Sequence, residues 1–206
     1  MGSFKNWKNV FSNKTEVAEN KTNLAISLLI DSSGSVSKQG HKTQLDTIYL
    51  IAKTLEETKN KTEVIEFSGN NRHDKNGFKV IKSFNKKVEE GEFKRHFSGG
   101  NWLNPPLKQA LKDLNGESIK NKFVIVITDG NLTSDGNTIS EMNEQINEFK
   151  KNNIPVYCIL VNPCDSGYKF FDKNIQINDF NKVNTELSIL ILDIQKKIIK
   201  QNTGVY

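Results

Sequence analysis

A set of hard oxygen donors follows the first apolar run of the chain. Asp31, Ser33 and Ser35 come at alternate positions directly after the run Leu24–Ile30. A short apolar run with polar flanks is typical of a buried strand, and open α/β sheets bind their ligands at the carboxyl ends of strands. Gly34 allows a tight turn that aims the three side chains at one point, and carboxylate and hydroxyl oxygens suit a hard cation. The loop is therefore predicted to form the floor of a divalent-cation site.

A second carboxylate stands in the same kind of position. The apolar run Phe123–Ile127 ends in Thr128, Asp129 and Gly130, which repeats the arrangement around Asp31. If the two strands are neighbours in a parallel sheet, their two polar ends lie side by side.

Strands and amphipathic helices alternate along the chain, which predicts a doubly wound, mostly parallel α/β sheet with helices on both faces. Strands are expected at about 23–30, Val64–Phe67, Phe78–Ile81, Phe123–Ile127, Ile154–Val161 and near Ile175–Ile177. Helices are expected at about 40–58, from Pro105, from about Thr138 and at the C-terminal end. Asn104 is predicted to cap the second helix, which Pro105 begins, and Thr138 and Glu141 form a capping box for the third.

Composition restricts the kind of protein. A length of 206 residues fits one domain, and the formal net charge of +5 comes almost entirely from dispersed lysines, since Arg72 and Arg95 are the only arginines. Specific readers of nucleic acid rely on arginine, so we expect no specific nucleic-acid partner, although weak binding to polyanions stays open. Two cysteines, no secretory leader and no apolar run of membrane-spanning length favour a cytoplasmic protein without a membrane partner.

Three loops together resemble one protein family. The sequence has D-S-S-G-S after the first strand, S-G-G-N-W-L before a helix and I-T-D-G after a central strand, and in this order it resembles the von Willebrand factor A domain. The resemblance covers about residues 22–203. It implies a Rossmann-like, six-stranded sheet with Phe78–Ile81 as its short antiparallel edge, and a domain over 22–206. The apolar residues Trp7 and Phe11 predict that residues 1–21 form an extension packed on this domain. Within the family, the chain looks most like intracellular bacterial-type members, such as cobaltochelatase-like and AAA+ ATPase-associated domains.

The resemblance also implies a metal-ion-dependent adhesion site (MIDAS). Carried over to this chain, Ser33 and Ser35 would bind Mg²⁺, or Mn²⁺ or Ca²⁺, through their hydroxyls, while Asp31 and Asp129 would hold the metal's waters. Asn101 stands where the family usually has threonine, and an amide oxygen is longer and differently aimed than a hydroxyl. The metal site is therefore intact, altered in its preference or weak, and Ser98 or Thr133 are alternative ligands.

In this family the cation typically takes one more oxygen from an Asp or Glu carboxylate of a partner protein. Trp102 lies next to Asn101 in the sequence, where it would add apolar contact area around that carboxylate. The alternative is that Trp102 packs inward against the helix that begins at Pro105. Both interpretations stay open at this point.

These features lead to one function and two alternatives. We expect a non-catalytic, cation-dependent protein-interaction module, monomeric by itself, that works in a larger intracellular assembly with a partner such as a AAA+ ATPase. The first alternative is a structural scaffold, for instance of a virion or similar particle, with a vestigial MIDAS. The second is a metal-dependent hydrolase, which lacks an evident general base. His41, His73 and His96 do not have the spacing of a zinc site, and Cys158 is expected in the core.

Overall fold

A single six-stranded sheet forms the centre of the computed structural model, which describes residues 23–36, 38–69, 77–96, 99–129, 139–161 and 170–203. The strand order is β3-β2-β1-β4-β5-β6. The strands are β1 (Leu24–Asp31), β2 (Lys61–Phe67), β3 (Phe78–Lys82), β4 (Asn121–Thr128), β5 (Val156–Val161) and β6 (Lys173–Ile177). All pairs are parallel except β2 with β3. The predicted fold class and antiparallel edge strand are thus confirmed.

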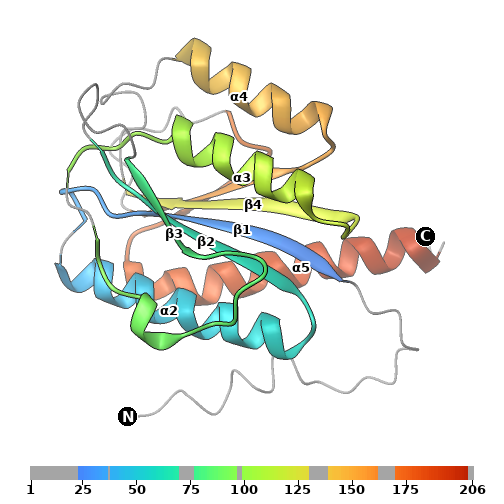
Figure 1. Ribbon diagram of the computed structural model, residues 1–206, viewed down its shortest axis with the longest axis horizontal. Helices are drawn as coiled ribbons and strands as arrows, with labels where there is room; N and C mark the ends of the chain where they lie inside the picture. Colours follow the sequence, from blue (N-terminus) through green and yellow to red (C-terminus); the bar gives the residue numbers. More distant parts are fainter. Residues whose placement is uncertain are drawn as a thin grey trace.

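Within the described ranges, four long helices cover the two faces of the sheet (Figure 1). They are α2 (Lys38–Glu57), α3 (Asn104–Gly116), α4 (Ile139–Lys151) and α5 (Val183–Thr203), with short 3₁₀ turns η2 (Glu90–Glu92) and η3 (Phe180–Lys182). Helices α2 and α5 lie on one face, and α3 and α4 lie on the other. No helix in the described ranges is both long enough and apolar enough to cross a lipid bilayer.

The core has two layers because alternate side chains of each strand point to opposite faces. In β1, Leu28 and Ile30 join the layer beneath α2 and α5, whereas Ala25 and Leu29 join the layer beneath α3 and α4. Every residue of β1 is buried, which explains why its sequence is nearly continuous in apolar residues. Cys158 is fully buried in the second layer, as expected.

Several predicted boundaries were wrong, and strands β2 and β4 begin at Lys61 and Asn121, earlier than the expected Val64 and Phe123. Asn104 is the first residue of α3 and not its cap: Leu103 holds the cap position without a side-chain hydrogen bond, and its carbonyl accepts from Leu107 N–H. Strand β5 begins at Val156 because Ile154 N–H closes α4 on the Phe149 carbonyl, and Pro155 has no N–H to donate. The predicted N-terminal extension over 1–21 and the Thr138 capping residue lie outside the described residues.

Candidate metal-binding site

The polar ends of β1 and β4 meet at one edge of the sheet. The two strands are parallel neighbours, and Ile30 lies opposite Ile127 in the register. Asp31 therefore ends β1 beside Thr128 and Asp129 at the end of β4. The prediction that these two edges lie side by side is confirmed.

The carboxyl group of Asp31 is completely buried and held by three segments of the chain. Ser33 N–H donates to Oδ1 at 2.8 Å, while Thr128 Oγ1 at 2.5 Å and Asn101 Nδ2 at 2.8 Å donate to Oδ2. Burial raises the pKa of Asp31 to about 6, and the hydrogen bonds from Thr128 and Ser33 oppose that rise. Hydrogen bonds to both of its oxygens therefore fix the orientation of this carboxyl group.

A row of hydrogen-bonded polar groups leads from Asp31 through the Ser33 N–H and the hydroxyls of Ser33 and Ser35 to Asp129. Ser35 Oγ donates to Asp129 Oδ1 at 2.9 Å, and Ser33 Oγ lies 2.9 Å from Ser35 Oγ. Since Ser35 has one hydroxyl proton and gives it to Asp129, Ser33 must be the donor to Ser35. Ser33 is buried, Asp129 is half-buried and Ser35 is exposed. Burial raises the pKa of Asp129, and its hydrogen bond from Ser35 counteracts this.

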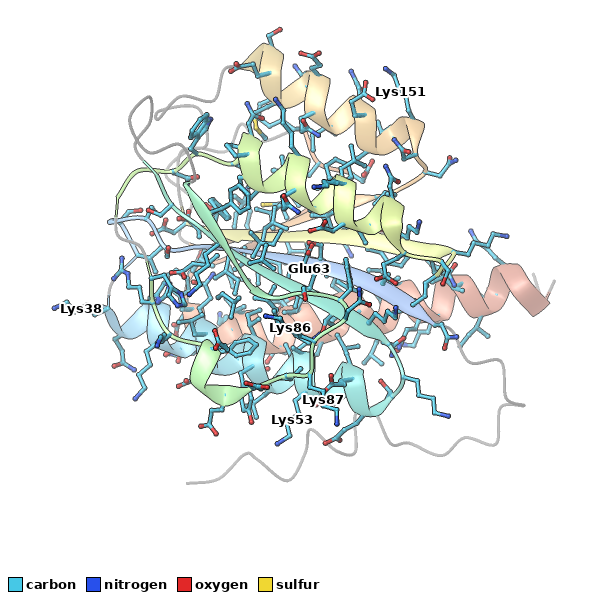
Figure 2. The ribbon with its side chains drawn as sticks, viewed as in Figure 1. Lys38, Lys53, Glu63, Lys86, Lys87 and Lys151 are labelled. Carbon is cyan, nitrogen blue, oxygen red and sulfur yellow. The ribbon has the colours of Figure 1, made fainter. Side chains whose placement is uncertain are left out.

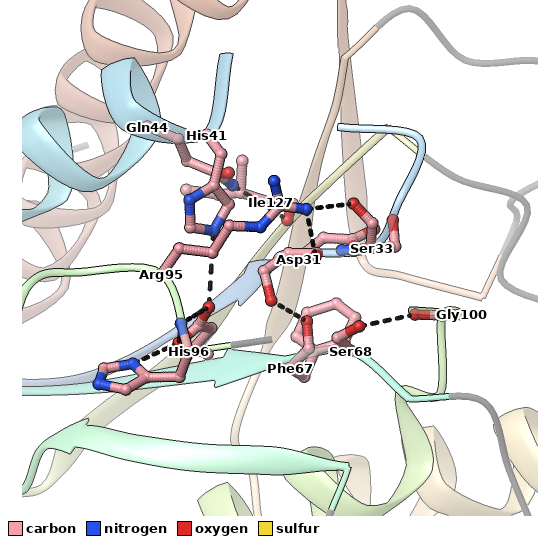
Figure 3. Close-up of polar contacts among 12 residues, drawn as sticks. Asp31, Ser33, His41, Gln44, Phe67, Ser68, Arg95, His96, Gly100 and Ile127 are labelled. Carbon is pink, nitrogen blue, oxygen red and sulfur yellow. Dashed lines mark hydrogen bonds and ion pairs between the residues drawn. The ribbon is translucent and has the colours of Figure 1, made fainter. Parts of the chain in front are cut away.

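Asn101 comes from a second loop, which packs on the first. Gly34 N–H donates to the Gly99 carbonyl at 2.7 Å, and Gly69 N–H donates to the Gly100 carbonyl at 2.9 Å. Ser68 Oγ, just after β2, also donates to the Gly100 carbonyl at 3.2 Å (Figure 3). The Asn101 amide nitrogen faces Asp31 and lies 3.3 Å from Thr128 Oγ1. In this arrangement Asn101 positions Asp31, and its predicted role as a ligand stays a prediction.

Trp102 is half-buried, and one edge of its ring lies close to Gly77. A Cβ atom added at Gly77 would come within 2.9 Å of the Ser68 carbonyl and 3.5 Å of Trp102 Cε3. A glycine is therefore needed for this close approach. The indole keeps part of its surface accessible, so contact with a partner and inward packing both remain predictions.

The donor set at this edge fits a hard divalent cation. Two hydroxyls and the carboxylate of Asp129 converge, with Asp31 directly behind them. Oxygen ligands of this kind suit Mg²⁺, Mn²⁺ and Ca²⁺. No group of three or more His, Cys, Asp or Glu side chains in the described ranges could hold a metal ion. A cation here would depend on Ser33, Ser35 and Asp129, whereas Ser98 and Thr133 lie outside the described residues.

Two residues that support the site were missed from the sequence. Thr128 donates to Asp31, although only its neighbour Asp129 was singled out. Arg95 donates through Nη2 to the carbonyls of Ser32 and Ser33 at 3.0 and 3.1 Å. Thr128 stood inside the recognised T-D-G segment and could have been found there. Arg95 lies in a charged stretch without clear periodicity, so no pattern pointed to it.

Comparison with known proteins gives one family match. The model of the von Willebrand factor type A domain matches residues 25–195. The sequence matched no curated protein.

Several solved structures share the fold at low sequence identity. The pilus adhesin SpaC from Lactobacillus rhamnosus GG, in its open conformation, superposes with a TM-score of 0.65 at 17% identity, covering 87% of this chain and 31% of the adhesin. Proximal thread matrix protein 1 from the mussel byssus, with a zinc-occupied MIDAS motif, gives 0.65 at 17% identity, covering 84% of this chain and 48% of that protein. The SpRpn10 VWA domain gives 0.59 at 13% identity, covering 80% and 95%. This chain thus spans less than half of the adhesin and of the thread protein.

Proposed function

Because this chain belongs to the von Willebrand factor type A domain family, we propose that it is a divalent-cation-dependent protein-interaction module. Ser33, Ser35 and Asp129 would hold Mg²⁺, or Mn²⁺ or Ca²⁺, and Asp31 would stand behind them with its charge directed at the cation. An Asp or Glu carboxylate of a partner protein would complete the coordination of the metal. The bound cation supplies the positive charge that attracts this carboxylate.

The observation that carries the proposal is the hydrogen-bonded row that runs from buried Asp31 through Ser33 to exposed Ser35 and Asp129. Two of its members are neutral hydroxyls, so a cation bound there keeps much of its charge and retains affinity for an external anion. The row ends at the surface, where a partner can reach it. The mussel protein whose structure has a zinc-occupied MIDAS motif supports the proposal, since it shares this fold.

We further propose that the domain has no catalytic role and works as a monomer within a larger cytoplasmic assembly. A AAA+ ATPase or another assembly subunit is the partner that the resemblance to intracellular family members suggests. The hydroxyls of Ser33 and Ser35 support the non-catalytic interpretation, because their hydrogen bonds run to each other and to Asp129. A nucleophilic serine needs a general base such as histidine at this position.

The test is thermal unfolding of the purified protein in EDTA and in Mg²⁺, Mn²⁺ or Ca²⁺. A cation that binds only the folded state stabilises it by about 2.7 kcal/mol at a hundredfold excess over its Kd. We expect a rise in Tm that is lost in Ser35→Ala, because Ser35 is exposed and its hydroxyl can be removed without disturbing the core. Ser140→Ala, at an exposed serine of α4, is the matched control and should keep the full rise. A wild-type Tm that is the same in EDTA and in all three metals would contradict the proposal.

One observation favours the scaffold alternative. The amide group of Asn101 donates to Asp31 Oδ2, an oxygen that the proposed site would need to hold a metal-bound water. If this contact has replaced the metal, wild-type protein will not respond to cations and Asn101→Thr will. That pair of results would assign the domain to structural assembly with a vestigial metal site.

A further inference from the structure

A cluster of polar and charged side chains lies next to the candidate site. None of its members is a predicted metal ligand. The cluster consists of Glu66 at the end of β2, His41 in the first turn of α2, and the adjacent residues Arg95 and His96. Figure 3 labels His41, Arg95 and His96. We propose that this Glu66 cluster is a positioning device that holds the Asp31 loop and the Asn101 loop in the relative placement that a cation needs. The inference deepens the proposed function and rests on it for the identity of the ligand.

Glu66 accepts hydrogen bonds from the segment that leads into the Asn101 loop and so holds it in place. Its side chain is completely buried, and the backbone N–H of His96 donates to both carboxylate oxygens at 3.0 and 3.1 Å. The His96 ring adds a contact of 2.7 Å from Nδ1 to Oε2. A carboxylate can only accept, so Nδ1 carries the proton in this contact. Three contacts to one residue fix the backbone shortly before Gly99, Gly100 and Asn101.

Arg95 extends this anchor to the other loop. Its guanidinium donates to the carbonyls of Ser32 and Ser33, the residues on either side of one peptide bond in the Asp31 loop. Arginine suits this task because its planar group presents several N–H donors in a fixed geometry. Glu66 holds His96 in place, and Arg95 is the adjacent residue. The hydrogen bonds from Arg95 therefore link this fixed segment to the Asp31 loop.

His41 completes the cluster from the helix side. Its Nε2 lies 3.6 Å from Glu66 Oε1, which is too long for a hydrogen bond, and the ring is almost completely buried. Burial lowers the pKa of His41 to about 4; nearby Glu66 acts in the opposite direction, whereas Arg95 and His96 add to the lowering. His41 is therefore neutral at pH 7, and Glu66 is shared by groups from α2 and from the segment before α3.

The end of β2 thus anchors both loops at once. Phe67, next to Glu66, accepts hydrogen bonds from Ser32 N–H at 2.8 Å and Ser32 Oγ at 3.2 Å. A site in which two of the ligands are neutral hydroxyls gains less from charge than one built from carboxylates alone, so its affinity depends more on how well its oxygens are placed before the cation arrives. Contacts that orient metal ligands typically change affinity by about 10–100-fold when removed.

Glu63 offers a matched control for testing Glu66. Both are fully buried acids of β2, three residues apart, but Glu63 accepts from Ser27 Oγ at 2.7 Å in the interior and does not reach the loops. We expect Glu66→Gln to weaken Mn²⁺ binding about tenfold by calorimetry, because Gln keeps the volume and loses the paired acceptors. Glu63→Gln should bind Mn²⁺ within about twofold of wild type. Equal affinities in the two variants would overturn the inference.

Arg95 provides a second test at a position outside the sheet. Arg95→Met removes the donors and keeps most of the side-chain volume, whereas Arg95→Lys retains a positively charged donor. A positioning role predicts weaker Mn²⁺ binding in Arg95→Met and partial recovery in Arg95→Lys. If both variants bind Mn²⁺ as wild type does, Arg95 does not position the loop.

Amide hydrogen exchange in EDTA separates this inference from the proposed function. Without any metal, the Ser32 and Gly34 amides should exchange faster in Glu66→Gln and Arg95→Met than in wild type, while amides of the central strand β4 stay protected. If the wild type binds no metal and the loop amides still respond, the inference holds and the metal-dependent function fails. If the loop amides do not respond in either variant, the positioning role is wrong whatever the wild type binds.

Discussion

Two fully buried acids of strand β2, Glu63 and Glu66, are accommodated in different ways. Glu66 accepts hydrogen bonds from His96 and lies among side chains that carry or can carry positive charge. Glu63 lies in the interior (Figure 2), where burial first and the nearby Asp113 second raise its pKa to about 9. The interior therefore keeps Glu63 protonated and surrounds Glu66 with donors. Of the two acids, only Glu66 contacts the segment that leads into the candidate metal-binding loops.

The largest expected effect separates the two residues by stability. Glu66→Leu removes the acceptor for His96 N–H and leaves buried donors unsatisfied, so we expect the free energy of unfolding to fall by about 3–5 kcal/mol. Glu63→Leu replaces an acid that folding must protonate, so at pH 7 the lost hydrogen bond from Ser27, worth about 1 kcal/mol, is offset by the proton uptake that is no longer needed. Urea denaturation at pH 7 measures both. A smaller loss for Glu66→Leu than for Glu63→Leu would contradict the comparison.

The second prediction concerns alkaline pH. The folded-state pKa of Glu63 is about 9 and its ordinary value is 4.5. The folded protein therefore holds this proton more tightly than the unfolded chain, and stability falls as pH rises above 4.5 through 9. The slope for one group reaches at most about 1.4 kcal/mol per pH unit. Glu63→Gln has no proton to lose, so it should gain stability relative to wild type between pH 6 and 9.

The control for this prediction is Glu66→Gln, which should not show the same alkaline gain. Chemical denaturation of the three proteins at pH 6, 7, 8 and 9 isolates the contribution of Glu63 as a difference from wild type. If the difference between wild type and Glu63→Gln is constant over this range, Glu63 is not a buried neutral acid.

The oxygens of the candidate site could be predicted from the sequence because they lie directly after strands, and the apolar runs of those strands are evident in the sequence. Asp31 and Asp129 each follow an apolar run, and the parallel arrangement of neighbouring strands brings such ends together. Asn101 was named as well, but its contact with Asp31 was not foreseen, since amide orientation depends on what the loop faces. Asn104 was taken for a helix cap because of the proline that follows, and the helix instead begins at Asn104 itself.

The Glu66 cluster could not be predicted because its members share no sequence pattern. Glu66 interrupts an apolar strand segment, which reads as an ordinary alternation of inward and outward positions. His41 lies in a helix, and Arg95 and His96 lie in an irregular segment. The sequence shows each of them alone, and only the packing of α2 and the segment 93–96 on the end of β2 brings them together.

The smallest expected effect concerns acid and has the opposite sign from that of Glu63. The pKa of His41 is lowered from 6.5 to about 4, so the unfolded chain binds this proton more readily than the folded protein does. Its contribution to stability is complete above pH 6.5 and is lost as pH falls towards 4. Asp31, with its pKa raised to about 6, opposes this loss because the folded state favours its protonated form. The contributions of His41 and Asp31 to the pH dependence of wild-type stability should therefore partly cancel between pH 6.5 and 4.

Replacing His41 removes one of the two opposing pH-dependent contributions to stability, and the difference from wild type then measures that contribution. His41→Gln eliminates the destabilising proton uptake, so between pH 6.5 and 4.5 its stability relative to wild type should rise as pH falls. Asn60→Ala, at a buried polar residue that accepts from Leu24 N–H far from the cluster, should differ from wild type by a constant amount over the same range. Denaturation in EDTA keeps metal binding out of the comparison. A His41→Gln curve parallel to wild type would show that His41 is already charged beside Glu66, and the cluster would then contain a true ion pair at that position.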